Sequence, residues 1–91
     1  METNYRVYVL KNDAGKRYIG LTENVDTRLA QHNAGESKWT AKYRPWELIW
    51  TSDPMPLTEA RKLENKLKRQ GGGSGFYTIT GLPRPSESSG S

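Results

Sequence analysis

The 91-residue chain contains no cysteine, which excludes disulfide frameworks, zinc fingers and thiol nucleophiles. It contains one histidine, so a bound metal must use oxygen ligands or that side chain. Long apolar runs are also absent: no stretch approaches the roughly 18 residues that a membrane helix needs. The N-terminus lacks the basic-then-apolar pattern of a signal peptide. We therefore expect a cytoplasmic protein with no membrane partner.

Apolar residues are scarce as well, at 33% of the chain, whereas 26% of the residues are charged. Because so short a chain cannot divide its apolar residues between two cores, we expect a single domain over residues 1–82, with its core in 5–70. Residues 83–91 (PRPSESSGS) are expected to form a disordered tail. The net charge of +4 favours nucleic acid as a partner; the alternative is a merely soluble surface.

Three segments have the alternation and the β-branched or aromatic content of strands. The first two, 5–10 (YRVYVL) and 16–20 (KRYIG), flank the turn residues Asn12, Asp13 and Gly15 and predict a hairpin. A third strand is expected at 46–52 (WELIWTS).

The remaining segments predict two helices and their connections. The first helix is expected to start after Thr22 as its N-cap and to end at about Asn33, before Gly35. The second is expected at 57–70. Between them, 35–45 (GESKWTAKYRP) predicts an exposed loop. Near the C-terminus, 71–75 (GGGSG) predicts a flexible joint, and 76–82 (FYTITGL) predicts either an edge strand or a segment that covers the core.

Glu64 interrupts the apolar side of the second predicted helix. The apolar residues that share one arc of this helix, with Glu64 near its edge, are Leu57, Ala60, Leu63 and Leu67. Burying an unpaired carboxylate is costly, so Glu64 needs a cation, a hydrogen-bond donor or a cleft. An ordinary ion pair with Arg61 or Lys68 is an equally open interpretation.

Four more side chains have the chemistry of a hydrolytic site. Arg28 and His32 are four residues apart and lie on one side of the first helix. Arginine suits phosphate oxygens, and histidine accepts or relays protons near neutral pH. Tyr8 and Tyr18 lie on the two hairpin strands. Purely structural roles are the alternative for each, and the four form a site with Glu64 only if packing brings them to one cleft.

Cations and aromatic residues are interleaved in the 35–45 segment, and the second helix is basic on its remaining faces. Such surfaces attract phosphates and stack bases, although a solvated helix face has a similar composition. The residues expected to contact nucleic acid are Lys38, Trp39, Lys42, Arg44, Arg61 and Lys68.

The order of these motifs resembles the GIY-YIG nuclease domain, especially its small standalone bacterial members. The resemblance covers about residues 7–69: VYV, then YIG, NVDTRLAQHN, RPW and EARKLENKLK. The GIY motif corresponds to Val7, Tyr8 and Val9, and Gly20 would permit close approach of backbone or substrate. The resemblance implies an α+β fold with a three-stranded antiparallel sheet flanked by helices. Many members carry a further C-terminal helix, in whose place this chain has GGGSGFYTITGL.

The resemblance also implies roles for the five residues. Tyr8 and Tyr18 would be the active-site tyrosines, with Tyr8 as general base, Arg28 the transition-state arginine, His32 an auxiliary proton acceptor and Glu64 the sole protein ligand of one Mg²⁺ or Mn²⁺ ion. The implied function is metal-dependent hydrolysis of DNA by a monomer, directed by DNA structure rather than sequence, with a partner protein supplying targeting. The strongest alternative is a catalytically idle nucleic-acid-binding module of the same fold, and a structural or interaction protein is a third possibility.

Overall fold

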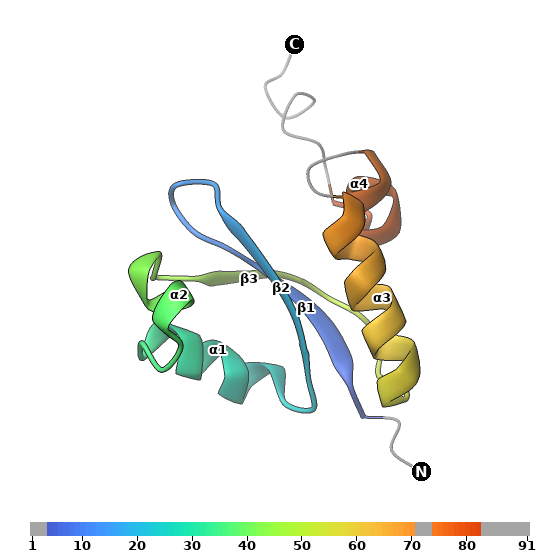
Figure 1. Ribbon diagram of the computed structural model, residues 1–91, viewed down its shortest axis with the longest axis horizontal. Coiled ribbons are helices and arrows are strands. Elements are labelled where there is room, and N and C mark those ends of the chain that lie inside the picture. Colours follow the sequence, from blue (N-terminus) through green and yellow to red (C-terminus); the bar gives the residue numbers. More distant parts are fainter. Residues whose placement is uncertain (1–3, 71–73, 83–91) are drawn as a thin grey trace.

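A three-stranded antiparallel sheet forms the middle layer of the molecule (Figure 1). The computed structural model describes residues 4–70 and 74–82. Strands β1 (Arg6–Lys11) and β2 (Arg17–Thr22) form the hairpin, and β3 (Glu47–Thr51) pairs with the other edge of β1. The strand order is therefore β2-β1-β3, and the predicted α+β class with a three-stranded antiparallel sheet is confirmed.

The hairpin turn uses the residues that its sequence predicts. The Asn12 amide donates to the Lys16 carbonyl at 3.0 Å, and the Asn12 side-chain oxygen accepts from the Lys16 amide at 2.8 Å. Gly15 has a φ of +85°, a left-handed conformation that glycine adopts without a steric penalty. The turn thereby fixes the register that places Tyr8 opposite Gly20.

Because β1 is the central strand, its side chains are buried on both faces of the sheet. Val7 and Val9 point into one core cluster, and Tyr8 and Leu10 point into another. Helices α1 (Val25–Asn33) and α2 (Lys38–Lys42) lie on the Tyr8 side of the sheet (Figure 1). Helices α3 (Leu57–Gln70) and α4 (Ser74–Thr80) cover the opposite face.

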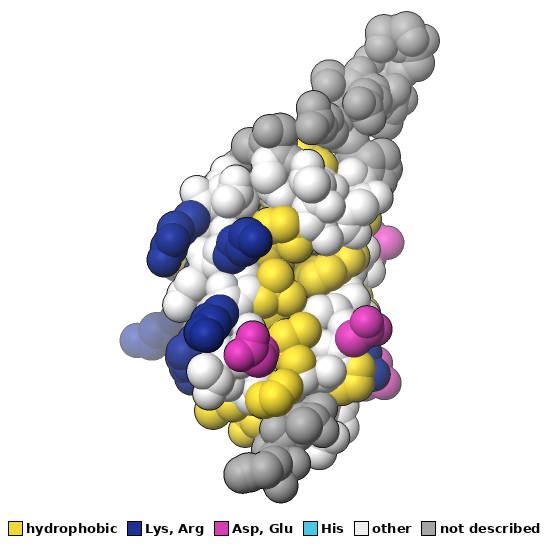
Figure 2. Space-filling view, turned by 90° about the vertical axis from the view of Figure 1, so that its right-hand side faces the viewer, with side chains coloured by type: hydrophobic (Ala, Val, Ile, Leu, Met, Phe, Trp, Pro, Cys, Tyr) yellow, Lys and Arg dark blue, Asp and Glu magenta, His cyan; other side chains and the backbone are white. Residues whose placement is uncertain are grey.

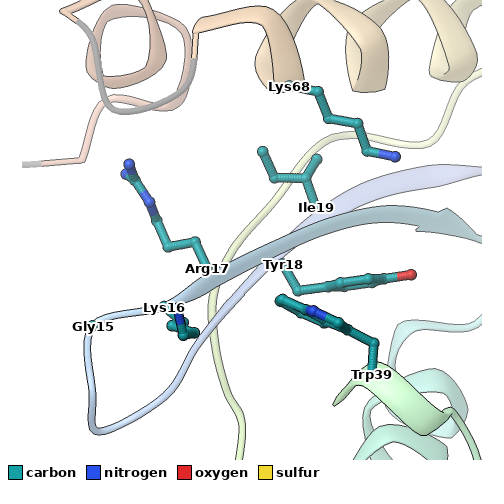
Figure 3. A pocket seen from close by; sticks show the side chains of 7 residues that line it. All are labelled: Gly15, Lys16, Arg17, Tyr18, Ile19, Trp39 and Lys68. Carbon is teal, nitrogen blue, oxygen red and sulfur yellow. The ribbon is translucent and has the colours of Figure 1, made fainter. Parts of the chain in front are cut away.

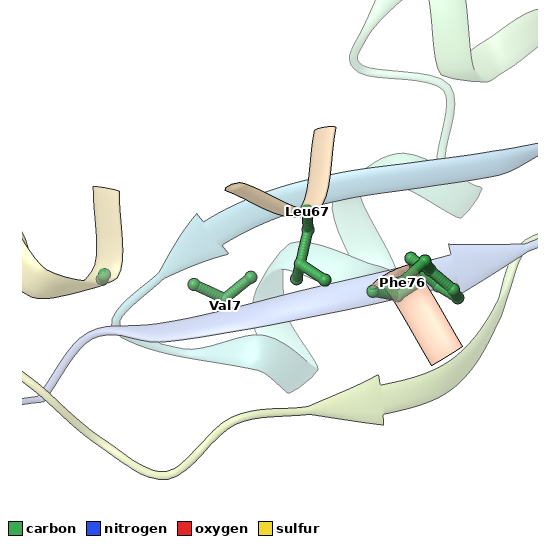
Figure 4. Packing of buried hydrophobic residues seen from close by; sticks show 5 residues of the cluster. Val7, Leu67 and Phe76 are labelled. Atoms are coloured by element: carbon green, nitrogen blue, oxygen red, sulfur yellow. The ribbon is translucent and has the colours of Figure 1, made fainter. Parts of the chain in front are cut away.

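The α3 and α4 layer is held by apolar packing against β1. Val7, Leu67 and Phe76 converge between the sheet and the two helices (Figure 4), and each is at most 1% exposed. Leu57, at the start of the predicted apolar arc, is exposed instead. The predicted bounds 57–70 of this helix agree with the structure.

Residues 76–82 were expected to form either an edge strand or a segment that covers the core. They cover the core, and most of them belong to helix α4. Phe76 and Thr80 are one helical turn apart and both buried, and the Thr80 hydroxyl donates to the Phe76 carbonyl at 3.0 Å. Burial of this face prevails over the strand preference of the local sequence. Residues 71–73 of the predicted joint and the whole predicted tail lie outside the described residues.

The start of α1 corrects the predicted N-cap. Asn24, not Thr22, is the cap: its side-chain oxygen accepts from the Thr27 amide at 3.0 Å. Thr22 is the last residue of β2, and its hydroxyl accepts from the Asn24 amide at 3.2 Å. Both residue types cap helices well, so the extent of β2 decides between them. Gly35 follows the helix with a φ of +84°, as predicted.

The segment 35–45 was predicted to be an exposed loop, but it contains the short helix α2. The prediction of a loop was therefore wrong. Thr40 of α2 is completely buried. Its carbonyl accepts from the Trp46 indole at 2.8 Å, while Asn33 pairs with the Trp46 backbone amide and carbonyl at 2.6 and 3.1 Å. These tertiary contacts stabilise a helical turn that is too short to persist alone. None of the helices in the described part of the chain has the length and hydropathy of a membrane span.

Gly20 should not tolerate a side chain. A Cβ atom at this position would lie 2.7 Å from the Tyr8 hydroxyl oxygen and 2.8 Å from the adjoining ring carbon. We expect Gly20→Ala to lower the free energy of unfolding by about 1–3 kcal/mol because the buried ring must move. Urea denaturation measures the loss. In a Tyr8→Leu background, which lacks both clashing atoms, the loss should largely vanish; an equal loss in both backgrounds would contradict this assignment.

Candidate active site

The centre of the site is a buried hydrogen-bonded chain that joins the sheet to α1 and α2. The Tyr8 hydroxyl lies 3.0 Å from His32 Nε2, and His32 Nδ1 lies 2.9 Å from Thr40 Oγ1. Tyr8 and His32 are each 1% exposed. The chain therefore brings together one residue from each of β1, α1 and α2, away from solvent.

Arg28 lies one turn before His32 on α1 and adds positive charge to the cluster. Its guanidinium interacts with the hydroxyls of Tyr8 and Tyr18, which raises the pKa of Arg28. Its Nη1 donates to Gln31 Oε1 at 2.9 Å. Arg28 as a whole is half-buried, so part of the residue is open to solvent.

Burial keeps both Tyr8 and His32 uncharged at neutral pH. Desolvation, with a further contribution from Tyr18, raises the pKa of Tyr8 to about 12, although Arg28 opposes the shift. Desolvation and then the Arg28 charge lower the pKa of His32 below its ordinary value of 6.5. A neutral imidazole has one nitrogen free to accept, so His32 can accept a hydrogen bond from the Tyr8 hydroxyl.

Tyr18 lies beside this chain but nearer the surface. Its ring centroid is 6.2 Å from that of Tyr8 and 4.7 Å from that of His32, which it meets edge-on. Ile19, the next residue, points to the opposite core cluster. The structure thus places Tyr8, Tyr18, Arg28 and His32 together.

Glu64 approaches from α3, and its negative charge is among the causes that raise the pKa of Tyr8. Its carboxylate is 13% exposed and pairs with Lys68 Nζ at 3.2 Å. Of the two ion pairs left open by the sequence, the one with Lys68 is present. That pair and a metal-binding role remain compatible, because a cation delivered with substrate can compete with an ammonium that is half exposed.

The ligand chemistry near Glu64 suits a hard cation. No group of three or more His, Asp or Glu side chains able to hold a metal occurs among the described residues. Mg²⁺ needs no such cage, because it retains waters and commonly binds through one or two carboxylates and substrate phosphates. The single, partly exposed carboxylate of Glu64 therefore fits Mg²⁺ or Mn²⁺ when waters and phosphate oxygens supply the other ligands.

A pocket of about 550 Å³ opens beside Tyr18. Figure 3 shows Lys68 of α3 on one side of β2 and Trp39 of α2 on the other, with the Tyr18 ring beside that of Trp39. We call this pocket the β2 groove; its lining is Gly15, Lys16, Arg17, Tyr18, Ile19, Trp39 and Lys68. Trp39 is 46% exposed, so the β2 groove offers both aromatic surface and positive charge.

The β2 groove contains only part of the predicted nucleic-acid-binding set. Trp39 and Lys68 line it, whereas four exposed residues lie outside its lining: Lys38, Lys42, Arg44 and Arg61. Lys16 and Arg17 line the groove and were missed, although they directly precede Tyr18 in the sequence. Thr40 was missed because it was assigned to an exposed loop.

Further cations lie on the outer face of the α3 and α4 layer. In Figure 2, Lys and Arg side chains gather along one flank of a band of hydrophobic side chains. The cations that α3 contributes are Arg61, Lys62, Lys66, Lys68 and Arg69. Only Lys68 among them reaches the lining of the β2 groove.

Comparison with known proteins identifies related sequences. The family model described as the GIY-YIG catalytic domain matches residues 4–75. A UPF0213 protein of Staphylococcus haemolyticus is 36% identical over 63 residues, which are 68% of this chain and 77% of that protein. One of Natronomonas pharaonis is 36% identical over 69 residues, covering 75% of this chain and 81% of that protein.

A third relative, a UPF0213 protein of Streptococcus pneumoniae, is 37% identical over 71 residues, covering 77% of this chain and 72% of that protein. The name UPF0213 states no reaction or substrate. No solved structure matches the chain. The family match spans the whole sheet and all the residues of the site just described, so the chain belongs to the GIY-YIG catalytic domain family, a family of the nuclease type.

Proposed function

We propose that this protein is an endonuclease that uses one divalent cation to hydrolyse DNA phosphodiester bonds. The observation that carries the proposal is that two residues lining the basic β2 groove connect it to the other site residues. Tyr18 contacts the rings of the buried Tyr8–His32 pair and interacts with Arg28, and Lys68 pairs with the Glu64 carboxylate. A proton acceptor, a charge for the phosphate and a metal ligand are the parts that such hydrolysis requires.

The β2 groove supports a polyanionic substrate. Lys16, Arg17 and Lys68 line it together with Tyr18 and Trp39, a combination that contacts phosphates and stacks bases. A groove of this size contacts few phosphates, so binding should be weak and salt-sensitive. Recognition of DNA structure is accordingly favoured over recognition of a long base sequence.

Glu64, together with water and phosphate oxygens, would hold the Mg²⁺ or Mn²⁺ ion, which when bound stabilises negative charge on the phosphate. Arg28 would neutralise the charge that grows on the phosphate oxygens as the new bond forms. Tyr18, at the edge of the groove, would orient the phosphate or the attacking water.

Tyr8 serves as a relay rather than as a preformed phenolate, because its pKa is about 12. Its oxygen takes a proton from the attacking water while its own proton passes to the neutral His32 Nε2, 3.0 Å away. Tyr8 is 1% exposed, and the Arg28 guanidinium interacts with its hydroxyl. Movement of the guanidinium from Tyr8 to the phosphate would uncover the hydroxyl for water.

Substitution of Arg28 and Glu64 tests the proposal. We expect Arg28→Ala to lower the rate of cleavage by about 10²- to 10³-fold, and Glu64→Gln to remove metal-dependent cleavage. A gel assay with single-stranded, duplex and branched DNA, with and without Mn²⁺, measures both. Glu59→Gln is the matched control, because Glu59 is an exposed α3 carboxylate that also pairs with a lysine, Lys62.

The outcome that would contradict endonuclease activity is equally specific. DNA binding by the folded wild-type protein with no nicking of any of the three substrates would support the idle binding module instead. Metal-dependent cleavage that survives both Arg28→Ala and Glu64→Gln would show that the activity lies elsewhere. Circular dichroism establishes that each variant is folded.

A second test concerns the β2 groove. Lys16→Gln removes a groove-lining cation, and we expect it to weaken DNA binding and to reduce the slope of log K against log salt by roughly 0.7 to 0.9, the value for one phosphate contact. Lys66→Gln is the control, because Lys66 is an exposed lysine of α3 outside the groove lining. Titration by fluorescence anisotropy at several salt concentrations gives both slopes. Equal changes for the two variants would contradict a binding site in the groove.

A further inference from the structure

Thr40 is a polar residue with no exposed surface, and its hydroxyl faces the single histidine of the chain. Thr40 Oγ1 lies 2.9 Å from His32 Nδ1 and 3.4 Å from the Ser37 carbonyl. The Thr40 carbonyl accepts from the Trp46 indole at 2.8 Å, which anchors the backbone at this point. The hydroxyl is thus held against the side of the imidazole that faces away from Tyr8.

The Tyr8 end of the chain is compatible with only one direction of its hydrogen bond to His32. Arg28 interacts with the Tyr8 hydroxyl, but arginine has no acceptor with which to receive the Tyr8 proton. The printed geometry offers His32 Nε2 as the partner for that proton, at 3.0 Å. If Nε2 were protonated instead, the buried Tyr8 O–H would lack an acceptor, which is unfavourable for a buried polar group.

The Thr40 end of the chain agrees with this direction. A neutral imidazole whose Nε2 accepts must carry its proton on Nδ1. Nδ1–H then donates to Thr40 Oγ1, and the Thr40 hydroxyl can direct its own proton to the Ser37 carbonyl. All donors then run one way, from Tyr8 through His32 to Thr40 and Ser37. No buried side-chain nitrogen or oxygen in the described part of the chain lacks a partner.

We propose that Thr40 is a positioning residue that holds His32 in the tautomer protonated on Nδ1, so that Nε2 is free to receive the proton of Tyr8. The tautomer assignment stands on this geometry alone, whereas its catalytic consequence rests on the proposed nuclease function. Free neutral histidine favours the opposite tautomer, protonated on Nε2, which would close the acceptor site facing Tyr8. The partner of one imidazole nitrogen commonly sets the state of the other.

Nuclear magnetic resonance tests the assignment without reference to activity. Because the chain has one histidine, the imidazole ¹⁵N signals need no further assignment to a residue. Spectra are recorded well above pH 6.5, where His32 is neutral. In the wild type we expect Nδ1 to resonate as a protonated nitrogen and Nε2 as an unprotonated one. The reverse pattern in the wild type would overturn the proposal, whatever the variants do.

Two variants then assign the effect to the hydroxyl. Thr40→Val keeps the shape of the side chain and removes the hydroxyl, so we expect the Nδ1-protonated form to lose its dominance. Thr40→Ser keeps the hydroxyl and should keep the wild-type pattern. A wild-type pattern in folded Thr40→Val would overturn the role of Thr40. If Thr40→Val does not fold, the wild-type and Thr40→Ser spectra still decide the tautomer.

Cleavage rates test the catalytic consequence separately. We expect Thr40→Val to lower the rate by about 10- to 100-fold with little change in DNA affinity, and Thr40→Ser to restore it. Full activity in Thr40→Val with an altered tautomer would overturn the catalytic part of the proposal. If wild-type protein cuts no DNA, the proposed function fails, and the ¹⁵N pattern alone then upholds or overturns the positioning role.

Discussion

The hydrogen bond between the Tyr8 hydroxyl and His32 Nε2 is the interaction on which the rest of the site depends. It crosses from the central strand to α1 inside the protein, where an unpaired hydroxyl or imidazole would be costly. Gly20 leaves the space that the Tyr8 ring fills, and Thr40 occupies the far side of the imidazole. The absence of a side chain at Gly20 and the burial of Thr40 therefore both accommodate this one contact.

Local patterns predicted the elements that carry strong periodicity or turn chemistry. The sheet, the bounds of α3 and the end of α1 before Gly35 follow from such patterns. Helices α2 and α4 do not, because each is short and is stabilised by tertiary contacts, through Thr40 and Trp46 in one case and Phe76 in the other. The N-cap of α1 was misplaced by two residues for a related reason: the length of β2 depends on pairing, not on local sequence.

The site residues likewise divide into those that local spacing predicted and those that only tertiary packing brings together. Spacing alone put Arg28 and His32 on one side of a helix, but only the motif order linked them to Tyr8, Tyr18 and Glu64. Their convergence is a product of packing, as is the β2 groove, which excludes Lys38, Lys42, Arg44 and Arg61 from its lining and includes Lys16 and Arg17. The sequence left two interpretations of Glu64 open, an ordinary ion pair and a metal ligand. Glu64 has an ion-pair partner in Lys68 and also acts electrostatically on Tyr8, and its proposed metal-binding role is compatible with both.

Paramagnetic broadening by Mn²⁺ measures that role most directly. Titration of ¹⁵N-labelled protein with Mn²⁺ should broaden amide signals around Glu64 first, and Glu64→Gln should abolish this pattern while leaving the fold intact. Broadening centred on another part of the molecule, or unchanged in Glu64→Gln, would contradict a single metal site built on Glu64.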